Sequence, residues 1–238
     1  GQYYTQEYKI GAPLYQVKTI TEAEVRKIIG PSHISLLSSQ SGTFTSFTPD
    51  PTIFKKTTEF DYRKIKGRIR ERAYLVPKLF MHVQDERSGE IANFYFESGI
   101  KSLVTHLNNH KKPLHNVISV RGDYEENGLK IGVEVALQYT DTFTENILSF
   151  ANVIHTYDGG THLTGFRMAL SKVIKDYLAK KGSGSNKLEL TGEDLKEGLT
   201  AVVFIKMSSS ETQFERQTKT KLNNPKAQSS VYPVLKEK

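Results

Sequence analysis

The sequence predicts a mixed α/β fold (α/β or α+β), with helices packed against a mixed sheet. Apolar residues alternate with period two along residues 131–139, which is typical of a strand with one buried face. They recur at spacings of three and four along 62–73 and again along 161–177, which is typical of amphipathic helices. Hydrophobic residues make up 37% of the 238 residues, enough for a core, so wholesale disorder is excluded.

The N-terminal part predicts extended structure interrupted by a loop. Residues 1–20 look extended, because Tyr4, Gln6, Tyr8 and Ile10 alternate with other residues before Gly11-Ala12-Pro13 ends the run. Residues 21–41 are polar and punctuated by Gly, Pro and Ser, and they predict an inserted loop with a helical turn at Glu22–Ile29. Thr43–Phe47 alternates again and predicts a strand, which Pro49-Asp50-Pro51 ends.

The middle of the chain predicts two helices and two pairs of strands. Thr58–Asp61 resembles a capping box, and an amphipathic helix follows it as far as Ala73, with basic residues on its other faces. The remaining elements are a hairpin of strands 79–84 and 91–96, a short helix over 100–107, and a pair of strands over 117–120 and 131–139.

The C-terminal part predicts a long helix and a buried strand. The helix begins near Thr161 and runs to about Lys180, and Gly182–Ser185 forms a flexible connection. A short helix is expected to open at Thr191–Asp194. Leu199–Met207 is strongly apolar and predicts a strand. The tail after it is basic and shows no long periodic segment.

The composition excludes several kinds of chemistry. Cysteine is absent, which excludes disulfides, thiolate zinc sites and cysteine catalysis. The seven histidines are scattered, so no metal site is expected. No run of about eighteen apolar residues occurs, so no membrane span is expected. The start at Gly1 has neither an initiator Met nor a signal-peptide pattern, and we expect the cut end of a longer cytoplasmic protein.

The charge balance and two polar segments point to an anionic partner. The formal net charge is +7, which favours nucleic acid or nucleotide phosphates, with solubility as an equal alternative. Gly159-Gly160-Thr161 could receive an anion at a helix N-terminus, although a plain turn and cap is favoured. Arg167 could face a phosphate or a structural carboxylate. Gln217–Lys221 offers lysines suited to a terminal phosphate, with a solvated surface as the ordinary alternative.

Five strings, taken in order and spacing, resemble one family. They are VEVALQY at 133–139, TENI at 144–147, DGGTHLTGFR at 158–167, LTGEDLKEGLTAV at 190–202 and QTKTKL at 217–222. Together they resemble the DNA gyrase B family, with the paralogous ATPase component of topoisomerase IV as a close second. The resemblance covers nearly the whole chain.

The resemblance implies a domain organisation and an activity. Residues 1–51 resemble the last strands of a GHKL ATP-binding domain with the inserted loop 21–41. Residues 52–222 resemble the ribosomal-protein-like transducer domain, and 223–238 form a tail. The family's nucleotide pocket would precede Gly1 and its toprim metal motifs would follow Lys238. The chain is therefore expected to be an internal fragment of an ATP-dependent type II topoisomerase, inactive alone, that couples ATP binding and hydrolysis to DNA strand passage.

The resemblance also implies site residues and partners. Lys219 corresponds to the transducer lysine that reaches the ATP γ-phosphate and acts in catalysis, and Gln217 assists it in binding ATP. Thr161, His162 and Arg167 correspond to the helix that faces the dimer cavity through which DNA passes. The implied cofactors are ATP and Mg²⁺, bound mostly by residues outside this chain. The implied partners are DNA, gyrase A or its paralogue, and a second copy of the ATPase region.

The sequence departs from the family pattern at three places, and two other functions are alternatives. Arg216 stands where the family usually has glycine, Ser208–Thr212 lengthens the preceding loop, and the segment after Asn224 fits the pattern poorly. One alternative is a stand-alone nucleic-acid-binding module that uses the basic helix 63–72. Another is the transducer of a mismatch-repair or chaperone GHKL ATPase, against which QTKTKL and LTGEDLKEGLTAV argue.

Overall fold

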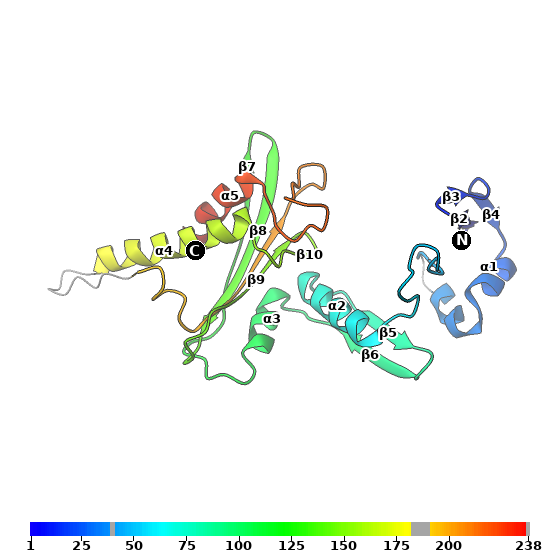
Figure 1. The fold of residues 1–238 in the computed structure, drawn as a ribbon, viewed down its shortest axis with the longest axis horizontal. Coiled ribbons are helices and arrows are strands. Elements are labelled where there is room, and N and C mark those ends of the chain that lie inside the picture. The colour runs from blue at the N-terminus through cyan, green and yellow to red at the C-terminus, as the bar shows by residue number, and fades with distance from the viewer. Residues whose placement is uncertain (39–40, 182–190, 237–238) are drawn as a thin grey trace. The chain divides into compact units, whose positions relative to one another are not determined.

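The chain forms two compact units in a computed structural model that describes residues 1–38, 41–181 and 191–236. The first unit is Gly1–Glu59 and the second is Phe60–Lys238 (Figure 1). The predicted flexible connection Gly182–Ser185 lies outside the described residues. Within the described ranges, no helix has both the length and the apolar character needed to cross a membrane.

The first unit consists of short strands followed by helical turns. β1 (Tyr3–Thr5) pairs antiparallel with β4 (Lys18–Ile20), and β2 (Tyr8–Lys9) pairs antiparallel with β3 (Ala12–Pro13). α1 (Glu22–Ile29) starts at a capping box and is followed by the 3₁₀ helix η1 (Pro31–Ser38). The predicted extended start and the helical turn at 22–29 are therefore confirmed.

The prediction of a strand over Thr43–Phe47 is wrong. These residues have no strand geometry and their side chains are exposed. Alternation by itself does not make a strand, because a strand needs a neighbour to accept its backbone hydrogen bonds. No described strand pairs with this segment.

The second unit is built on a five-stranded mixed sheet in the order β10-β9-β11-β8-β7. β11 runs antiparallel to β8 and parallel to β9, while β7 and β8 form a hairpin. That hairpin turns at Asn127 and Gly128, which both have positive φ and so match the twist of the strands. The mixed α/β fold class is thereby confirmed. The strands are β7 (Ile118–Glu126), β8 (Leu129–Tyr139), β9 (Asn146–Ala151), β10 (Ile154–His155) and β11 (Leu199–Lys206).

Helices cover both faces of this sheet. α4 (Thr161–Lys181) and α5 (Pro225–Lys236) pack together on one face, where Val133, Val135 and Phe166 belong to the larger core cluster. α3 (Ile100–Leu107) packs on the other face (Figure 1). There Tyr74, Phe150 and Phe204 belong to a second cluster. The apolar side chains at every second position of β8, among them Val133 and Val135, belong to the core cluster on the first face. Ala136, which lies between two of them, belongs to the cluster on the second face.

A helix and a hairpin pack against each other beside α3. The helix is α2 (Tyr62–Leu75), and the hairpin consists of β5 (Met81–Asp85) and β6 (Glu90–Phe94). The predicted helix and hairpin are confirmed, with one change at the helix start. Asp61, rather than Thr58, is the N-cap: its carboxylate accepts a hydrogen bond from the Lys64 N–H at 3.2 Å.

The segment after Asn224 is a helix, which corrects the expectation of an aperiodic tail. The Asn224 side chain accepts the Lys226 N–H at 3.1 Å, as an N-cap does, and Pro225 occupies the first helical position. Ala227 and Val231 are fully buried against the core. The signal was present in the sequence, because Asn-Pro followed by apolar residues at helical spacing predicts a helix start.

The short helix predicted at Thr191–Asp194 is a turn. Asp194 accepts the Thr191 N–H at 2.7 Å, and the Asp194 N–H donates to the Thr191 hydroxyl at 3.3 Å, so the capping contacts do form. The chain nevertheless enters β11 directly after Gly198, whose φ of 71° is left-handed. A Cβ at Gly198 would lie 2.3 Å from the Thr140 carbonyl oxygen, so close backbone packing ends the turn there.

Candidate functional site

A tight hairpin over residues 213–223 presents the predicted phosphate-binding lysine. The Asn223 N–H donates to the Gln213 carbonyl at 2.8 Å, and the Glu215 N–H donates to the Lys221 carbonyl at 3.0 Å. At the tip, the Lys219 N–H closes a turn onto the Arg216 carbonyl at 2.9 Å. We call this segment the 213–223 hairpin; Gln217 and Lys219 lie exposed at its tip.

Lys219 is strained in its backbone and uncompensated in its charge. Its φ is 59°, a left-handed conformation that is uncommon for a residue with a side chain. Its Nζ lies 5.9 Å from the centre of the Phe214 ring, and no carboxylate of the described residues is within ion-pair distance. Lys221 differs, because its Nζ lies 2.7 Å from a Glu215 carboxylate oxygen. The hydrogen bond from Lys221 lowers the pKa of Glu215. The residue pattern does not predict the role of Glu215, because that role depends on the pairing within the hairpin.

The glycine turn at 158–160 is joined to the 213–223 hairpin through the backbone. The Asp158 N–H donates to the Thr220 carbonyl at 2.9 Å, and the Leu222 N–H donates to the Gly159 carbonyl at 3.1 Å. The Thr161 N–H at the start of α4 donates to the Leu222 carbonyl at 3.0 Å. The chain itself thus satisfies a donor that an anion would have used. The structure matches the turn-and-cap interpretation of this motif.

His162 is buried, which corrects its expected place on a DNA-facing surface. The residue is 0% exposed, and its Nε2 lies 3.1 Å from the Thr156 hydroxyl. That hydroxyl in turn donates to the Ser149 carbonyl at 2.8 Å. No described residue makes a hydrogen bond with Nδ1. Burial without a charged partner lowers the pKa of His162 to about 4, so the ring is neutral in the folded protein.

The burial of His162 predicts a loss of stability in mild acid. The unfolded chain binds a proton near the ordinary histidine pKa of 6.5, and the folded chain binds it only near 4, so stability falls as the pH falls between these values. The expected loss from this residue is about 2 kcal/mol at pH 5. Urea unfolding at pH 7.5 and pH 5 measures it. His162→Asn should remove about 2 kcal/mol of the difference between the two pH values, and an equal difference in both proteins would contradict the assignment.

Arg167 and Thr161 lie beside a small hollow near the start of α4. The Arg167 guanidinium donates to Glu145 at 2.7 Å, so its nearest partner is a structural carboxylate; the side chain is still 46% exposed. Thr161 is half-buried and its hydroxyl has no described hydrogen-bond partner. The hollow has a volume of about 250 Å³ and also includes Lys221. Thr161, Arg167 and Lys221 of the 213–223 hairpin therefore line the same hollow, whereas His162 is buried and does not line it.

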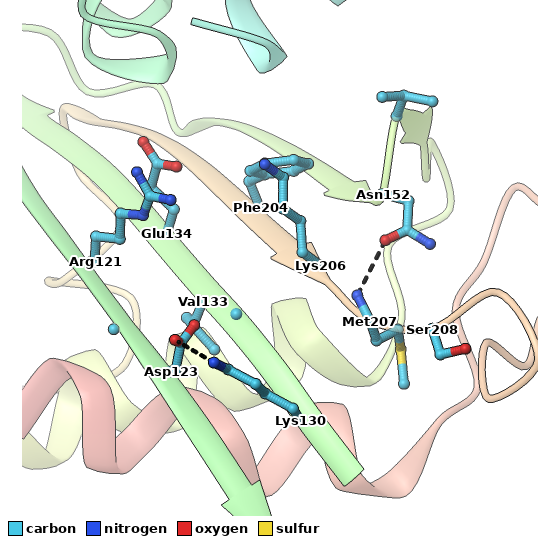
Figure 2. Close-up of a pocket in the computed structure, with 13 residues that line it drawn as sticks. Arg121, Asp123, Lys130, Val133, Glu134, Asn152, Phe204, Lys206, Met207 and Ser208 are labelled. Carbon is cyan, nitrogen blue, oxygen red and sulfur yellow. Dashed lines mark hydrogen bonds and ion pairs between the residues drawn. The ribbon is translucent and has the colours of Figure 1, made fainter.

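A larger hollow of about 460 Å³ lies on the sheet, away from these residues (Figure 2). Lys130 pairs with Asp123 across the β7–β8 hairpin at 3.1 Å, and Arg121 lies beside Glu134, its partner in register (Figure 2). None of the predicted site residues lines it. Its charges are of both signs, so it has no marked preference for an anion.

Comparison with known proteins identifies the family. The family model described as DNA gyrase B matches residues 99–238, more than half of the chain. The chain belongs to the DNA gyrase B family. The resemblance carried by the five strings is thereby confirmed, and the match favours this family over other GHKL ATPases. The match also runs through α5, so the segment after Asn224 fits the family pattern, contrary to expectation.

Individual DNA gyrase B proteins resemble the chain closely. It is 44% identical over 228 residues to DNA gyrase B of Enterococcus faecalis, covering 94% of this chain and 32% of that protein. It is 41% identical over 242 residues to DNA gyrase B of Bacillus mycoides, covering 100% of this chain and 54% of that protein. The chain thus spans about a third and about half of these curated relatives.

A solved structure matches the fold over the whole chain. It is the crystal structure of the 43K ATPase domain of Thermus thermophilus gyrase B in complex with an aminocoumarin. The TM-score is 0.74 at 32% identity, covering 100% of this chain and 59% of that one.

Proposed function

We propose that this chain is part of the ATPase region of a type II DNA topoisomerase and senses the ATP γ-phosphate through Lys219. The observation that carries the proposal is the uncompensated ammonium group at the tip of the 213–223 hairpin. A strained residue kept at an exposed tip, with no ion-pair partner among the described residues, indicates a binding role. Membership of the DNA gyrase B family supports the assignment.

Lys219 suits a role as a sensor because its contact would depend on one phosphate group. An interaction made with ATP and lost with ADP shifts the balance between two arrangements of the protein. The hairpin is joined to the turn at 158–160 by backbone hydrogen bonds, and the chain continues from it into α5. A displacement of the hairpin tip would therefore be transmitted to the core of the second unit. This connection supports the proposal that ATP binding and hydrolysis are coupled here to DNA strand passage.

The donor set at the hairpin tip fits a phosphate and not a whole nucleotide site. Lys219 supplies an ammonium group and Gln217 an amide donor, which together suit one phosphate group. In the ranges that the structure describes, no three His, Cys, Asp or Glu side chains gather as a metal site requires. We therefore propose that ATP and Mg²⁺ are held mainly by other parts of the protein, with Lys219 and Gln217 completing the site.

The chain alone is expected to hydrolyse no ATP. Phosphoryl transfer needs a group that positions the water and ligands for Mg²⁺. No segment of the 238 residues resembles the family motifs that supply them. Phosphate release should stay at background in an ATP titration, while full-length gyrase serves as the positive control. Saturable activity that Lys219→Ala abolishes would contradict this expectation.

We also propose that DNA, gyrase A or its paralogue, and a second copy of the ATPase region are partners, with Arg167 and Thr161 facing the DNA. A nucleic-acid-binding module is the second candidate function. It is favoured by Arg63, Arg70 and Arg72 of α2, which are exposed and form no ion pair with a described residue.

Duplex DNA binding by the chain is expected to be weak and salt-sensitive. With two to four phosphate contacts, affinity should fall by about 10- to 100-fold between 50 and 200 mM salt. Contacts to phosphate carry no sequence information, so unrelated duplexes should bind alike. Fluorescence anisotropy at both salt concentrations tests this. Tight binding that ignores salt, or a clear preference for one sequence, would exclude it.

A further inference from the structure

Two side chains of α2 reach across to strand β10 and the residues after it. The Glu71 carboxylate lies 2.8 Å from His155 Nδ1, and its other oxygen lies 3.3 Å from the Arg68 guanidinium. Arg68 also donates to the Tyr157 hydroxyl. The His155 side chain is 10% exposed and that of Glu71 is 24% exposed, so solvent screens this contact only in part.

Aromatic stacking completes the contact. The His155 ring stacks on the Tyr157 ring at a centroid distance of 3.8 Å and meets the Phe150 ring in a tilted contact at 4.6 Å. The Arg68 guanidinium lies 5.2 Å from the centre of the Tyr157 ring. We call Arg68, Glu71, His155 and Tyr157 the α2 clasp. Tyr157 is 55% exposed, so its position depends largely on these stacking and hydrogen-bonding contacts.

The clasp lies directly before the turn that holds the 213–223 hairpin. Tyr157 is followed by Asp158, whose N–H donates to Thr220, next to Lys219 in sequence. Leu222 then holds the turn at 158–160 through both of its backbone groups. Its N–H donates to the Gly159 carbonyl, and its carbonyl accepts the N–H of Thr161. A short run of backbone therefore leads from the side chains of α2 to the tip lysine.

We propose that Glu71 and Arg68 are positioning residues for Lys219: by holding His155 and Tyr157 against α2, they fix the turn at 158–160 and so orient the 213–223 hairpin. The inference rests on the proposed phosphate contact of Lys219 and extends it to residues that make no contact with a nucleotide. α2 is also the first helix of the second unit, so the clasp ties the hairpin to the start of that unit.

The clasp acts on the orientation of the hairpin rather than on its formation. Glu71 takes part neither in the backbone bonds of the hairpin nor in the Lys221–Glu215 ion pair, so both should persist when Glu71 is changed. Removal of Glu71 leaves His155 Nδ1 without its hydrogen-bond partner. Arg68 loses its ion-pair partner and keeps its hydrogen bond to the Tyr157 hydroxyl. The turn at 158–160 then has fewer constraints on its N-terminal side, and openings of its bonds to Thr220 and Leu222 become more frequent.

Hydrogen exchange of the chain tests the structural half of the inference. In Glu71→Ala, the amides of Asp158, Thr161 and Leu222 should exchange at least about fivefold faster than in the parent chain. Lys66→Ala is the matched control, since Lys66 lies on the same helix and pairs with Glu90 of β6 at 2.7 Å, away from β10. Unchanged exchange at Leu222 in Glu71→Ala, or an equal increase in Lys66→Ala, would overturn the inference.

ATP hydrolysis by full-length gyrase carrying these substitutions tests the functional half. Glu71→Ala should lower kcat by about 3- to 10-fold, less than the loss of Lys219 itself, because Glu71 acts only through the position of that lysine. In a Lys219→Ala background, Glu71→Ala should have no further effect, because the group that it positions is already absent. Glu71→Gln, which keeps an acceptor oxygen, should restore at least half of the lost activity.

The two proposals fail in different ways. Full additivity of Glu71→Ala and Lys219→Ala would overturn the positioning role while leaving the phosphate contact intact. An unaffected Lys219→Ala enzyme would overturn the phosphate contact, and the exchange measurement would still decide whether the clasp controls the hairpin. Loss of activity in Glu71→Gln as severe as in Glu71→Ala, with unchanged melting, would also contradict the hydrogen-bond geometry.

Discussion

Lys219→Ala in the full-length enzyme is expected to slow ATP hydrolysis by at least about tenfold while the melting temperature stays within about 1 °C. A charge-assisted hydrogen bond to phosphate contributes about 1.5–3 kcal/mol, and one directed at transition-state charge contributes more. The side chain is exposed, with its Nζ 5.9 Å from the centre of the Phe214 ring, so its removal costs little packing. Steady-state ATPase kinetics and a thermal melt measure the two effects.

Lys219→Gly separates function from strain at the same position. Glycine adopts a φ of 59° without penalty, so this variant should be as stable as the parent or up to about 1 kcal/mol more stable. Its activity should fall as far as that of Lys219→Ala. An active Lys219→Gly enzyme would mean that the residue serves only the shape of the hairpin.

Lys221→Ala is the charge-matched control. Its ammonium group is neutralised by Glu215 at 2.7 Å, so it contributes little to the field beyond the hairpin. We expect less than about a threefold loss of activity from this change. Equal losses in Lys219→Ala and Lys221→Ala would show that general electrostatics, and not a specific phosphate contact, controls the rate.

Gly160→Ala is expected to destabilise the second unit by at least about 3 kcal/mol. The φ of Gly160 is 137°, which residues with a side chain rarely adopt. A Cβ there would lie 2.3 Å from the Leu222 carbonyl oxygen and 2.6 Å from its nitrogen, both of them backbone atoms that cannot turn aside. The substitution should therefore separate the turn at 158–160 from the hairpin.

Thermal or urea unfolding measures the destabilisation by Gly160→Ala, and Gly67→Ala is the control substitution at a glycine with free space around it. Gly67 lies in α2, where a Cβ would meet no atom within 4 Å among the described residues beyond its own stretch of helix, so alanine should stabilise the chain by about 0.5–1 kcal/mol. For Gly160→Ala, a melting temperature lower by about 6–12 °C is expected. A Gly160→Ala protein that melts with the parent would show that the contact between Gly160 and Leu222 is dispensable.

Elements with a local residue pattern are predictable from the order of residues. β8 and α4 were predicted because burial on one face repeats every second residue in a strand and at spacings of three and four in a helix. The string QTKTKL pointed to Lys219 through resemblance, and the family match confirms the family, though not the role of the lysine. β9 was not predicted, because a short strand buried on both faces shows no alternation.

The spatial relations among the candidate residues follow from the folded chain and cannot be read from the residue pattern. His162 and Arg167 lie on the same helix, yet one is buried against Thr156 and the other is exposed beside Glu145. The turn at 158–160 and the hairpin at 213–223 meet through backbone hydrogen bonds, which leave no trace in side-chain patterns. Residue types and spacings encode local burial, whereas contacts between distant segments depend on strand order and backbone approach, which the folded chain alone sets.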